Sequence, residues 1–296
     1  MVTGATGGIG EAITTKLADQ GARVLGVART HERGEAALAR IRRRVPDALV
    51  EMLVADLSDL AQVANLAEQV TSQVKRLDVL ILNAAVARPR RELTTDGFEV
   101  DFATNHLSGF LLTHRLQKLL RTSAPARVIT ISSSAHRHVG QVDLDALITG
   151  RDFHHLRTYA ATKLLTIWFT TELARRLAGT GITAYAADPG FVRTGLGRDA
   201  PGGFGLFLRA VRPFQRNPAK GASTPLFLAT SAEVADTTSG GYFADCRPTE
   251  TSALAQDSAA AGQLWALSSQ LITPAGDRWT AIHPIEPQRE SRGGER

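Results

Sequence analysis

A tyrosine and a lysine four residues apart are the strongest chemical signal in this sequence. Tyr159 and Lys163 open a segment whose apolar pattern predicts a helix over Tyr159–Ala178. Residues at this spacing share one face of a helix, so the phenol and the ammonium should be neighbours. A free tyrosine has a pKa of about 10, and a nearby cation lowers it. Tyr159 could then exchange a proton with an alcohol or a carbonyl oxygen.

Three consecutive serines are candidate hydrogen-bond donors to the same oxygen. Ser132, Ser133 and Ser134 follow Arg127–Ile131, a run whose composition predicts a buried strand. Side chains alternate along a strand, so Ser132 should point to the other side from Ser133. Ser134 competes with Ser133 for the role.

A glycine-rich turn at the start of the chain is suited to phosphate. The segment TGATGGIG runs from Thr3 to Gly10, and a helical pattern follows over Glu11–Asp19. Glycines let the backbone approach a pyrophosphate, and the N–H groups at a helix start attract its charge. Only Met1 and Val2 precede the turn, whereas a full strand has about five residues. We therefore expect a very short first strand, or a chain start that omits part of it.

The elements that must position these residues alternate in type. Short apolar runs predict strands, and amphipathic segments between them predict helices, which implies right-handed crossovers and a parallel sheet. The sequence thus predicts an α/β fold, a single doubly wound Rossmann-type domain with a parallel sheet flanked by helices. The predicted strands are Arg23–Val27, Ala48–Val54, Asp78–Leu82, Arg127–Ile131 and Ile182–Ala186, and the remaining predicted helices are Glu32–Arg44, Leu60–Gln73 and Gly97–Leu120.

Taken in order along the chain, these motifs resemble those of the short-chain dehydrogenase/reductase family. TGATGGIG is similar to the family's TGxxxGIG signature, Asn83-Ala84-Ala85 to its NAG element, and Tyr159-Ala-Ala-Thr-Lys163 to its YxxxK motif. Pro189-Gly190 follows a later strand, with Thr194 close behind, as in the family. The resemblance extends to about Ile272. It is nearest to the retinol-dehydrogenase-like branch, through strings such as NHLSGFLLTHRL and SGGYFADC.

The resemblance implies a nicotinamide-dependent oxidoreductase and gives roles to single residues. Ser133 takes the place of the catalytic serine, Tyr159 that of the general acid/base, and Lys163 also holds the nicotinamide ribose. Asn105 matches a helix asparagine that holds a water beside the lysine, although it could also be a polar core residue satisfied by backbone. The implied cofactor contacts are Thr3, Gly4, Gly8, Ile9, Gly10, Arg29, Asp56, Leu57, Asn83, Ala84, Tyr159, Lys163, Pro189, Gly190 and Thr194.

The end of the second strand favours NADP(H) over NAD(H). An acidic side chain there would bind the ribose 2′-hydroxyl of NAD. None occurs at Val27, Ala28 or Arg29, and Arg29 offers a planar fork for a 2′-phosphate. Asp56 matches an aspartate that contacts adenine in the family, and it could also cap the next helix.

Two other functions stay open. Gly4, Gly7 and Gly10 also fit TGxxGxxG, the pattern of extended-type NAD-dependent epimerases and dehydratases. A non-catalytic nucleotide-binding scaffold could keep the same fold. The presence of Tyr159 and Lys163 together with the serine and asparagine argues for an active alcohol dehydrogenase or carbonyl reductase.

Composition and spacing argue against several other classes. The net charge of +5 comes from scattered basic residues, with one cluster at Arg42, Arg43 and Arg44, so no nucleic-acid partner is expected. No long apolar run or secretory leader is visible, and the single cysteine, Cys246, cannot form an internal disulfide, so we expect a cytoplasmic protein. No G-x-S-x-G elbow indicates a hydrolase. No metal is expected, because four loop histidines fit no zinc spacing and should be solvated; these are His136, His138, His154 and His155.

The segment after Pro189-Gly190 predicts a mobile lid over about 195–217. Glycines open it and apolar residues follow, among them Phe207 and Phe214. Such a lid suits a small lipophilic alcohol or carbonyl substrate, and its arginines, including Arg216, leave open a peripheral membrane contact. We expect one domain over 1–272 and a C-terminal extension over 273–296, whose end has no apolar period. A homo-oligomer is left open.

Overall fold

The computed structural model describes residues 1–192 and 216–273, apart from the side chains of residues 235 and 236. Thr194, most of the predicted lid and nearly all of the predicted C-terminal extension lie outside these residues.

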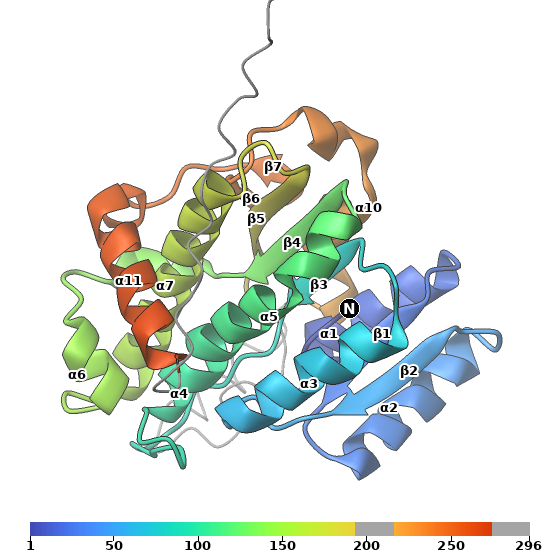
Figure 1. Ribbon diagram of the computed structural model, residues 1–296, viewed down its shortest axis with the longest axis horizontal. Coiled ribbons are helices and arrows are strands. Elements are labelled where there is room, and N and C mark those ends of the chain that lie inside the picture. Colours follow the sequence, from blue (N-terminus) through green and yellow to red (C-terminus); the bar gives the residue numbers. More distant parts are fainter. Residues whose placement is uncertain (193–215, 274–296) are drawn as a thin grey trace, which may run out of the picture.

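A mainly parallel sheet forms the centre of the fold (Figure 1). Its strands are β1 Val24–Ala28, β2 Val50–Val54, β3 Val79–Leu82, β4 Ala126–Ile131, β5 Ile182–Asp188, β6 Tyr242–Ala244 and β7 Arg247–Pro248. β1 pairs with β2, and β3 to β7 pair in sequence order, with only β7 antiparallel to its neighbour.

Val2 joins the two parts of the sheet. It forms parallel bridges to Gly26 on β1 and to Ile81 on β3. Its N–H donates to the Leu25 carbonyl at 2.8 Å, and its carbonyl accepts from the Val27 N–H at 2.9 Å. This pairing brings the glycine turn to the middle of the sheet.

Helices cover both faces of the sheet. The main ones are α1 Gly8–Asp19, α2 His31–Arg44, α3 Leu60–Gln73, α5 Ser108–Thr122, α7 His155–Arg176, α10 Ser223–Thr230 and α11 Ser258–Leu271. In Figure 1, α3, α5 and α11 lie in front of the sheet. Within the described residues, no helix is long and apolar enough to cross a membrane.

The alternation of strand side chains separates two cores. Val128 and Ala184 pack with α3, α5, α7 and α11, whereas their neighbours Ile129 and Tyr185 pack with α1, α2 and α10. All four are fully buried. This two-sided burial is why the strands read as continuous apolar runs, and it leaves the carboxyl ends of the strands to carry polar residues.

The long helix predicted over Gly97–Leu120 is present from Val100 to Thr122, but it contains a π-helical turn that was not predicted. Its first part is the short α4 Val100–Phe102, followed by a π-helical turn, η1 Ala103–Leu107, and only then by α5. Glu99 caps α4 by accepting the Phe102 N–H at 2.9 Å. A π-helical turn is rare, occurs often at functional sites, and is invisible to a pattern based on 3.6 residues per turn.

Candidate active site

Tyr159 and Lys163 lie near the start of α7, on the face that packs toward the sheet. The Lys163 side chain is 3% exposed, and its Nζ donates to the Ile131 carbonyl at the end of β4, at 2.9 Å. The same Nζ lies 5.4 Å from the centroid of the partly buried Tyr159 ring. Tyr159 and Lys163 are therefore neighbours in the structure, as their spacing predicts. Lys163 also links them to β4, the strand that the three serines follow.

Burial, rather than the ammonium, dominates the titration of the phenol in this structure. Removal from water raises the pKa of Tyr159 above its ordinary value, and Asp188 and Asp101 raise it further. The lowering expected from Lys163 is thus not observed. Burial also lowers the pKa of Lys163 to about 8, against the raising effect of Asp101 and Asp188. A raised pKa favours the protonated form of Tyr159, which can donate a proton.

Two of the three serines have clearly different surroundings. Ser132 is 1% exposed, and its hydroxyl donates to the Lys163 carbonyl at 2.8 Å. Ser133 is half-buried, and its hydroxyl oxygen accepts the Ala135 N–H at 3.2 Å, which leaves its proton free for another acceptor. Ser134 is exposed at the start of η2 Ser134–His138. These surroundings favour Ser133 as the donor to a substrate oxygen.

Asn105 lies in the π-helical turn and ties it to the loop after β3. Its Oδ1 accepts the Val86 N–H at 2.7 Å, and its Nδ2 donates to the Val86 carbonyl at 2.8 Å and to the Thr162 hydroxyl at 3.0 Å. Thr162 is the residue before Lys163, so this contact links η1 to α7 next to the lysine. Protein groups satisfy the asparagine, and its water-holding role stays a prediction.

The backbone of the glycine turn distinguishes the two glycine patterns. Gly4 and Gly8 have φ of +65° and +54°, a region that disfavours other residues. A Cβ on Gly10 would collide with the Gly4 carbonyl and the Asn83 side chain. Gly7, by contrast, has extended backbone with φ 179°, and a Cβ there would meet nothing within 4 Å. The glycines that the turn requires are therefore those of TGxxxGIG, which disfavours the extended-type pattern.

Two polar side chains hold this turn against β3. The Thr3 hydroxyl accepts the N–H groups of Asn83 at 2.9 Å and Ala84 at 3.0 Å. The Asn83 amide donates to the Thr3 carbonyl at 2.9 Å and the Gly4 carbonyl at 3.3 Å. Asn83 and Ala84 thus brace the turn. Thr3 and Ala84 also line one cleft together with Leu57, Asn105 and Ile131.

The start of α1 fits the pyrophosphate of a dinucleotide. Its N-cap is Gly7, and no side chain caps the first turn. The first N–H groups of a helix have no partner within the helix, so here they can bind an anion. Ile9, which follows Gly8 in the turn, packs into the core on the α1 side of the sheet.

The residues expected to bind the adenosine part of the cofactor differ in burial and in hydrogen bonding. Arg29 is exposed immediately after β1 and pairs with no carboxylate of the described residues. Asp56 accepts the Ser58 N–H at 2.9 Å and the Ser58 hydroxyl at 2.7 Å. It does not cap the next helix, because Asp59 is the N-cap of α3. Leu57 is buried in the core on the α3 side.

Pro189 and Gly190 form a turn at the end of β5. Gly190 has φ of +75°, and its N–H donates to Asp188 Oδ1 at 2.7 Å. Just beyond the turn, Val192 forms a bridge with Arg216, whose guanidinium holds Asp245 at 2.5 Å and 3.0 Å. Arg216 is thus engaged in an ion pair with Asp245, and the peripheral membrane contact stays a prediction.

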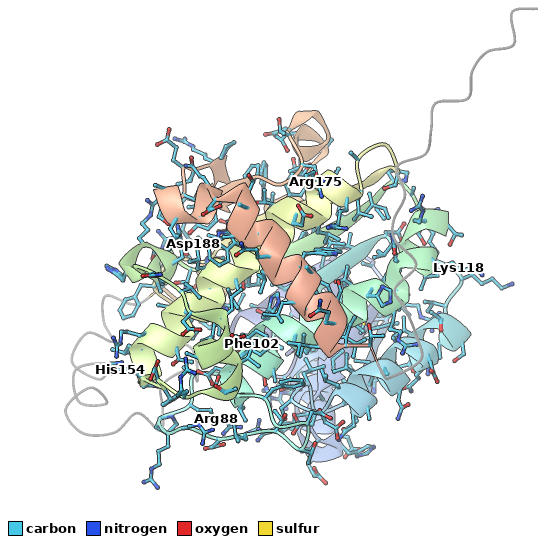
Figure 2. All side chains as sticks on the ribbon, turned by 60° about the vertical axis from the view of Figure 1, so that its left-hand side comes forward. Arg88, Phe102, Lys118, His154, Arg175 and Asp188 are labelled. Atoms are coloured by element: carbon cyan, nitrogen blue, oxygen red, sulfur yellow. The ribbon has the colours of Figure 1, made fainter. Side chains whose placement is uncertain are left out.

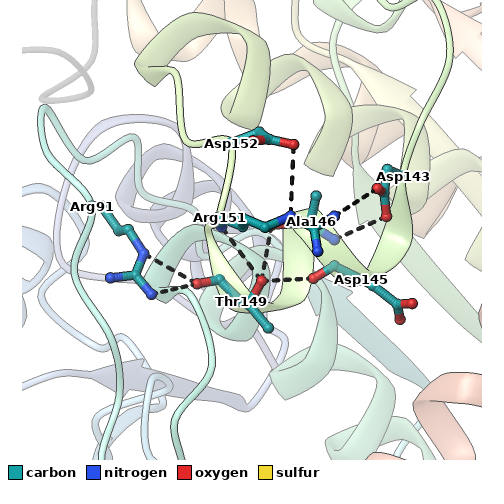
Figure 3. A network of polar contacts seen from close by, with 7 residues as sticks. All are labelled: Arg91, Asp143, Asp145, Ala146, Thr149, Arg151 and Asp152. Atoms are coloured by element: carbon teal, nitrogen blue, oxygen red, sulfur yellow. Dashed lines mark hydrogen bonds and ion pairs between the residues drawn. The ribbon is translucent and has the colours of Figure 1, made fainter.

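The loop after β3 is fixed to the helices on the other side of the site. The Arg88 N–H lies within hydrogen-bond distance of both Asp101 oxygens, and the Arg88 carbonyl contacts Nδ1 of His155 at 2.6 Å. Figure 2 shows Arg88 at the same end of the molecule as His154, where α7 begins. Arg91 donates to the Thr149 carbonyl at the end of α6 Leu144–Thr149, which the network in Figure 3 holds in place.

The prediction that all four loop histidines are solvated is wrong for two of them. His136 is fully buried, and His155 is partly buried against Arg88. His138 and His154 are exposed, as expected. Over residues 1–192 and 216–273 there is no group of three or more side chains that could hold a metal ion.

Two buried carboxylates near Tyr159 were not identified from the sequence. Asp188 and Asp101 are 6% and 0% exposed, and both act on the pKa of Tyr159 and of Lys163. The position of Asp188 between a strand and Pro-Gly was a signal for a turn-binding carboxylate. For Asp101 the sequence offered no comparable signal.

Comparison with known proteins identifies the family. The model of the short-chain dehydrogenases matches residues 1–201. Human "Retinol dehydrogenase 12" is 39% identical over 279 residues, which span 94% of this chain and 86% of that protein. Bovine "Dehydrogenase/reductase SDR family member 13" is 42% identical over 276 residues, 92% of this chain and 72% of that protein.

Solved structures agree with this relationship. A putative uncharacterized protein from Mycobacterium Paratuberculosis has a TM-score of 0.73 and 33% identity, with 91% of each chain covered. A putative NAD(P)-dependent gluconate 5-dehydrogenase from Beutenbergia cavernae, solved with bound NADP, has a TM-score of 0.66 and 26% identity, covering 82% of this chain and 92% of that one. The chain therefore belongs to the short-chain dehydrogenase/reductase family, in the branch that resembles the retinol dehydrogenases.

Proposed function

We propose that this protein is an NADP(H)-dependent enzyme that interconverts a lipophilic alcohol with its aldehyde or ketone, using Tyr159 as general acid/base. Family membership makes it an oxidoreductase of alcohols and carbonyls that binds a nicotinamide cofactor. The cofactor phosphate, the proton donor and the substrate class are the parts proposed here.

The single observation that carries the proposal is the anchored lysine beside the phenol. Lys163 Nζ lies 5.4 Å from the Tyr159 ring and is fixed on Ile131, directly before the serines. When bound, the cofactor supplies or accepts the hydride. Tyr159 then gives a proton to the carbonyl oxygen or takes one from the alcohol, and the Ser133 hydroxyl donates a hydrogen bond to that oxygen. Lys163 would also hold the nicotinamide ribose.

The uncapped N–H groups at the start of α1 suit the pyrophosphate of either cofactor. Two further features support NADP(H) over NAD(H). Arg29 is exposed and pairs with no described carboxylate where a 2′-phosphate would lie, and no acidic residue ends β1. Similar solved structures include NADP complexes. The expected cytoplasmic location, peripheral membrane contact and homo-oligomer stay predictions.

A substrate panel tests the proposal. Oxidation of NADPH and of NADH is followed with long-chain and ring-bearing aldehydes or ketones, and with short or charged carbonyls. We expect NADPH with lipophilic carbonyls to have the highest kcat/KM, since covering apolar surface is favourable by about 25 cal/mol per Å². The variants Phe207→Ser and Phe214→Ser should erase this preference. Faster reduction of small polar carbonyls by the unmodified enzyme would refute the lipophilic substrate class.

A further inference from the structure

A continuous set of buried contacts connects the Pro189-Gly190 turn with the serine segment. It begins at Asp188, the last residue of β5, whose two carboxylate oxygens have separate partners. Oδ1 accepts the Gly190 N–H at 2.7 Å, and Oδ2 accepts the Tyr242 hydroxyl on β6, also at 2.7 Å. Asp188 and Tyr242 are almost completely buried, with 6% and 5% of their surface exposed.

Tyr242 extends these contacts to His136. The two rings meet edge to face, with centroids 5.2 Å apart and planes at 68°. The His136 Nδ1 lies 2.7 Å from the Ser133 carbonyl, and its Nε2 accepts the Ser252 N–H at 3.3 Å. Because Nε2 is an acceptor, the proton of the neutral ring is on Nδ1, which donates to Ser133. Burial lowers the pKa of His136, which agrees with a neutral ring.

We propose that Asp188 and Tyr242 form a positioning pair that fixes the Pro189-Gly190 turn on the cofactor side of the site and, through His136, the Ser133 backbone on the substrate side. The inference rests on the proposed cofactor site. Neither residue needs to touch a reacting atom, because their effect is to hold two segments from different strands at one separation. Errors of about 1 Å in such positions cost much of the rate in enzymes.

The two hydrogen bonds of Asp188 require an acceptor at each of its side-chain oxygens or, at the second position, a donor to the Tyr242 oxygen. A carboxylate accepts from both Gly190 and Tyr242, so removal of the Tyr242 hydroxyl leaves a buried oxygen of Asp188 without its partner. Asparagine in place of Asp188 can keep both bonds. Its Oδ1 accepts from Gly190, and its Nδ2 donates to the Tyr242 oxygen, since a phenol is both donor and acceptor.

Tyr185 is a matched control for Tyr242. It is another fully buried strand tyrosine, on the opposite face of the sheet, and its ring lies edge to face with Phe243. Its hydroxyl donates to the Val234 carbonyl at 3.2 Å, and its side chain belongs to the core on the other side of the sheet from Tyr242. A Tyr→Phe change at either position removes one buried hydroxyl from the core.

The test measures NADPH and NADH binding by fluorescence titration, together with thermal stability and reduction kinetics. We expect Tyr242→Phe and Asp188→Ala each to raise the NADPH Kd by about three- to tenfold and to lower kcat/KM by more. The variant that carries both Tyr242→Phe and Asp188→Ala should bind NADPH with the same Kd as Asp188→Ala alone, because the two residues act as a unit. Asp188→Asn should keep the NADPH Kd within about twofold of the value for the unmodified protein, and Tyr185→Phe should change Tm but not Kd.

The outcomes separate this inference from the proposed function. An unmodified protein that binds neither cofactor would refute the proposed function itself. An unmodified protein that binds NADPH, with Tyr242→Phe binding it equally well at a Tm like that of Tyr185→Phe, would overturn the positioning pair alone. The pair is also wrong if Asp188→Asn loses as much affinity as Asp188→Ala, because the charge rather than the geometry would then matter.

Discussion

Lys163 on α7 donates a hydrogen bond across to the Ile131 carbonyl at the end of β4, at 2.9 Å. Ser132, the next residue, returns a hydrogen bond to the Lys163 carbonyl at 2.8 Å. These two bonds join the helix that carries Tyr159 to the strand that leads into Ser133. These bonds therefore help to set the position of the proton donor relative to the substrate's hydrogen-bond donor.

Replacement of Tyr159 by phenylalanine tests the proton transfer. Tyr159→Phe removes the hydroxyl and little volume, so turnover should fall by at least about a hundredfold while the fold is kept. NADPH binding, measured by fluorescence titration, should change little. Substantial residual turnover would show that another group supplies the proton.

The serine assignment predicts opposite phenotypes for adjacent residues. Ser133→Ala should lower kcat strongly, because the Ser133 hydroxyl proton has no protein acceptor among the described residues, and it should also lower Tm somewhat, because the hydroxyl oxygen accepts the Ala135 N–H. Ser132→Ala should mainly cost stability, about 1 kcal/mol for the lost bond to Lys163. Steady-state kinetics and thermal denaturation of both variants decide the point. The reverse order of rate losses would mean that the roles are exchanged.

Arg29 should select the phosphorylated cofactor. The unmodified protein should bind NADPH more tightly than NADH, and Arg29→Asp should shift that ratio by at least about tenfold, since a charge-assisted bond contributes about 1.5–3 kcal/mol. Arg42→Asp, at an exposed position in the last turn of α2, carries the same charge change and should leave the ratio alone. Equal affinities for both cofactors in the unmodified protein would contradict the role of Arg29.

Asp101 should make the fold less stable as pH rises. Burial, with a further contribution from Glu99, raises the pKa of Asp101 to about 8, whereas an unfolded aspartate titrates near 3.9. The folded chain thus keeps a proton that the unfolded chain releases, so this contribution to stability is complete below pH 4 and is lost as pH rises through 8.

Asp101→Asn should remove that dependence. We expect the Tm of the variant, relative to the unmodified protein, to increase steadily from pH 5 to pH 8. Asp145→Asn, on the exposed surface of α6, is the control for the same Asp→Asn change outside the core. A constant difference for Asp101→Asn would mean that Asp101 is already ionised in the folded protein at pH 5.

Local patterns were enough to predict most of the fold. The helix predicted over Leu60–Gln73 has these bounds in the structure, and each predicted strand is present within two residues at either end. Amphipathic periodicity is a property of neighbouring residues, so it is readable without knowledge of the tertiary structure. The π-helical turn around Asn105 was not predicted. Asn105 contacts Val86 and Thr162, and contacts between residues so far apart in sequence cannot be read from a local pattern.

The chemical types at the site and their order can be predicted from the sequence alone: the glycine turn, the serines, and Tyr159 with Lys163. The folded structure was needed to show which glycines are required, because φ and steric contact at Gly7 and Gly10 depend on the folded backbone. It also decided the direction of the Tyr159 pKa shift. Spacing along a helix predicts a nearby ammonium, but burial and the carboxylates of Asp101 and Asp188 come from other elements and outweigh it.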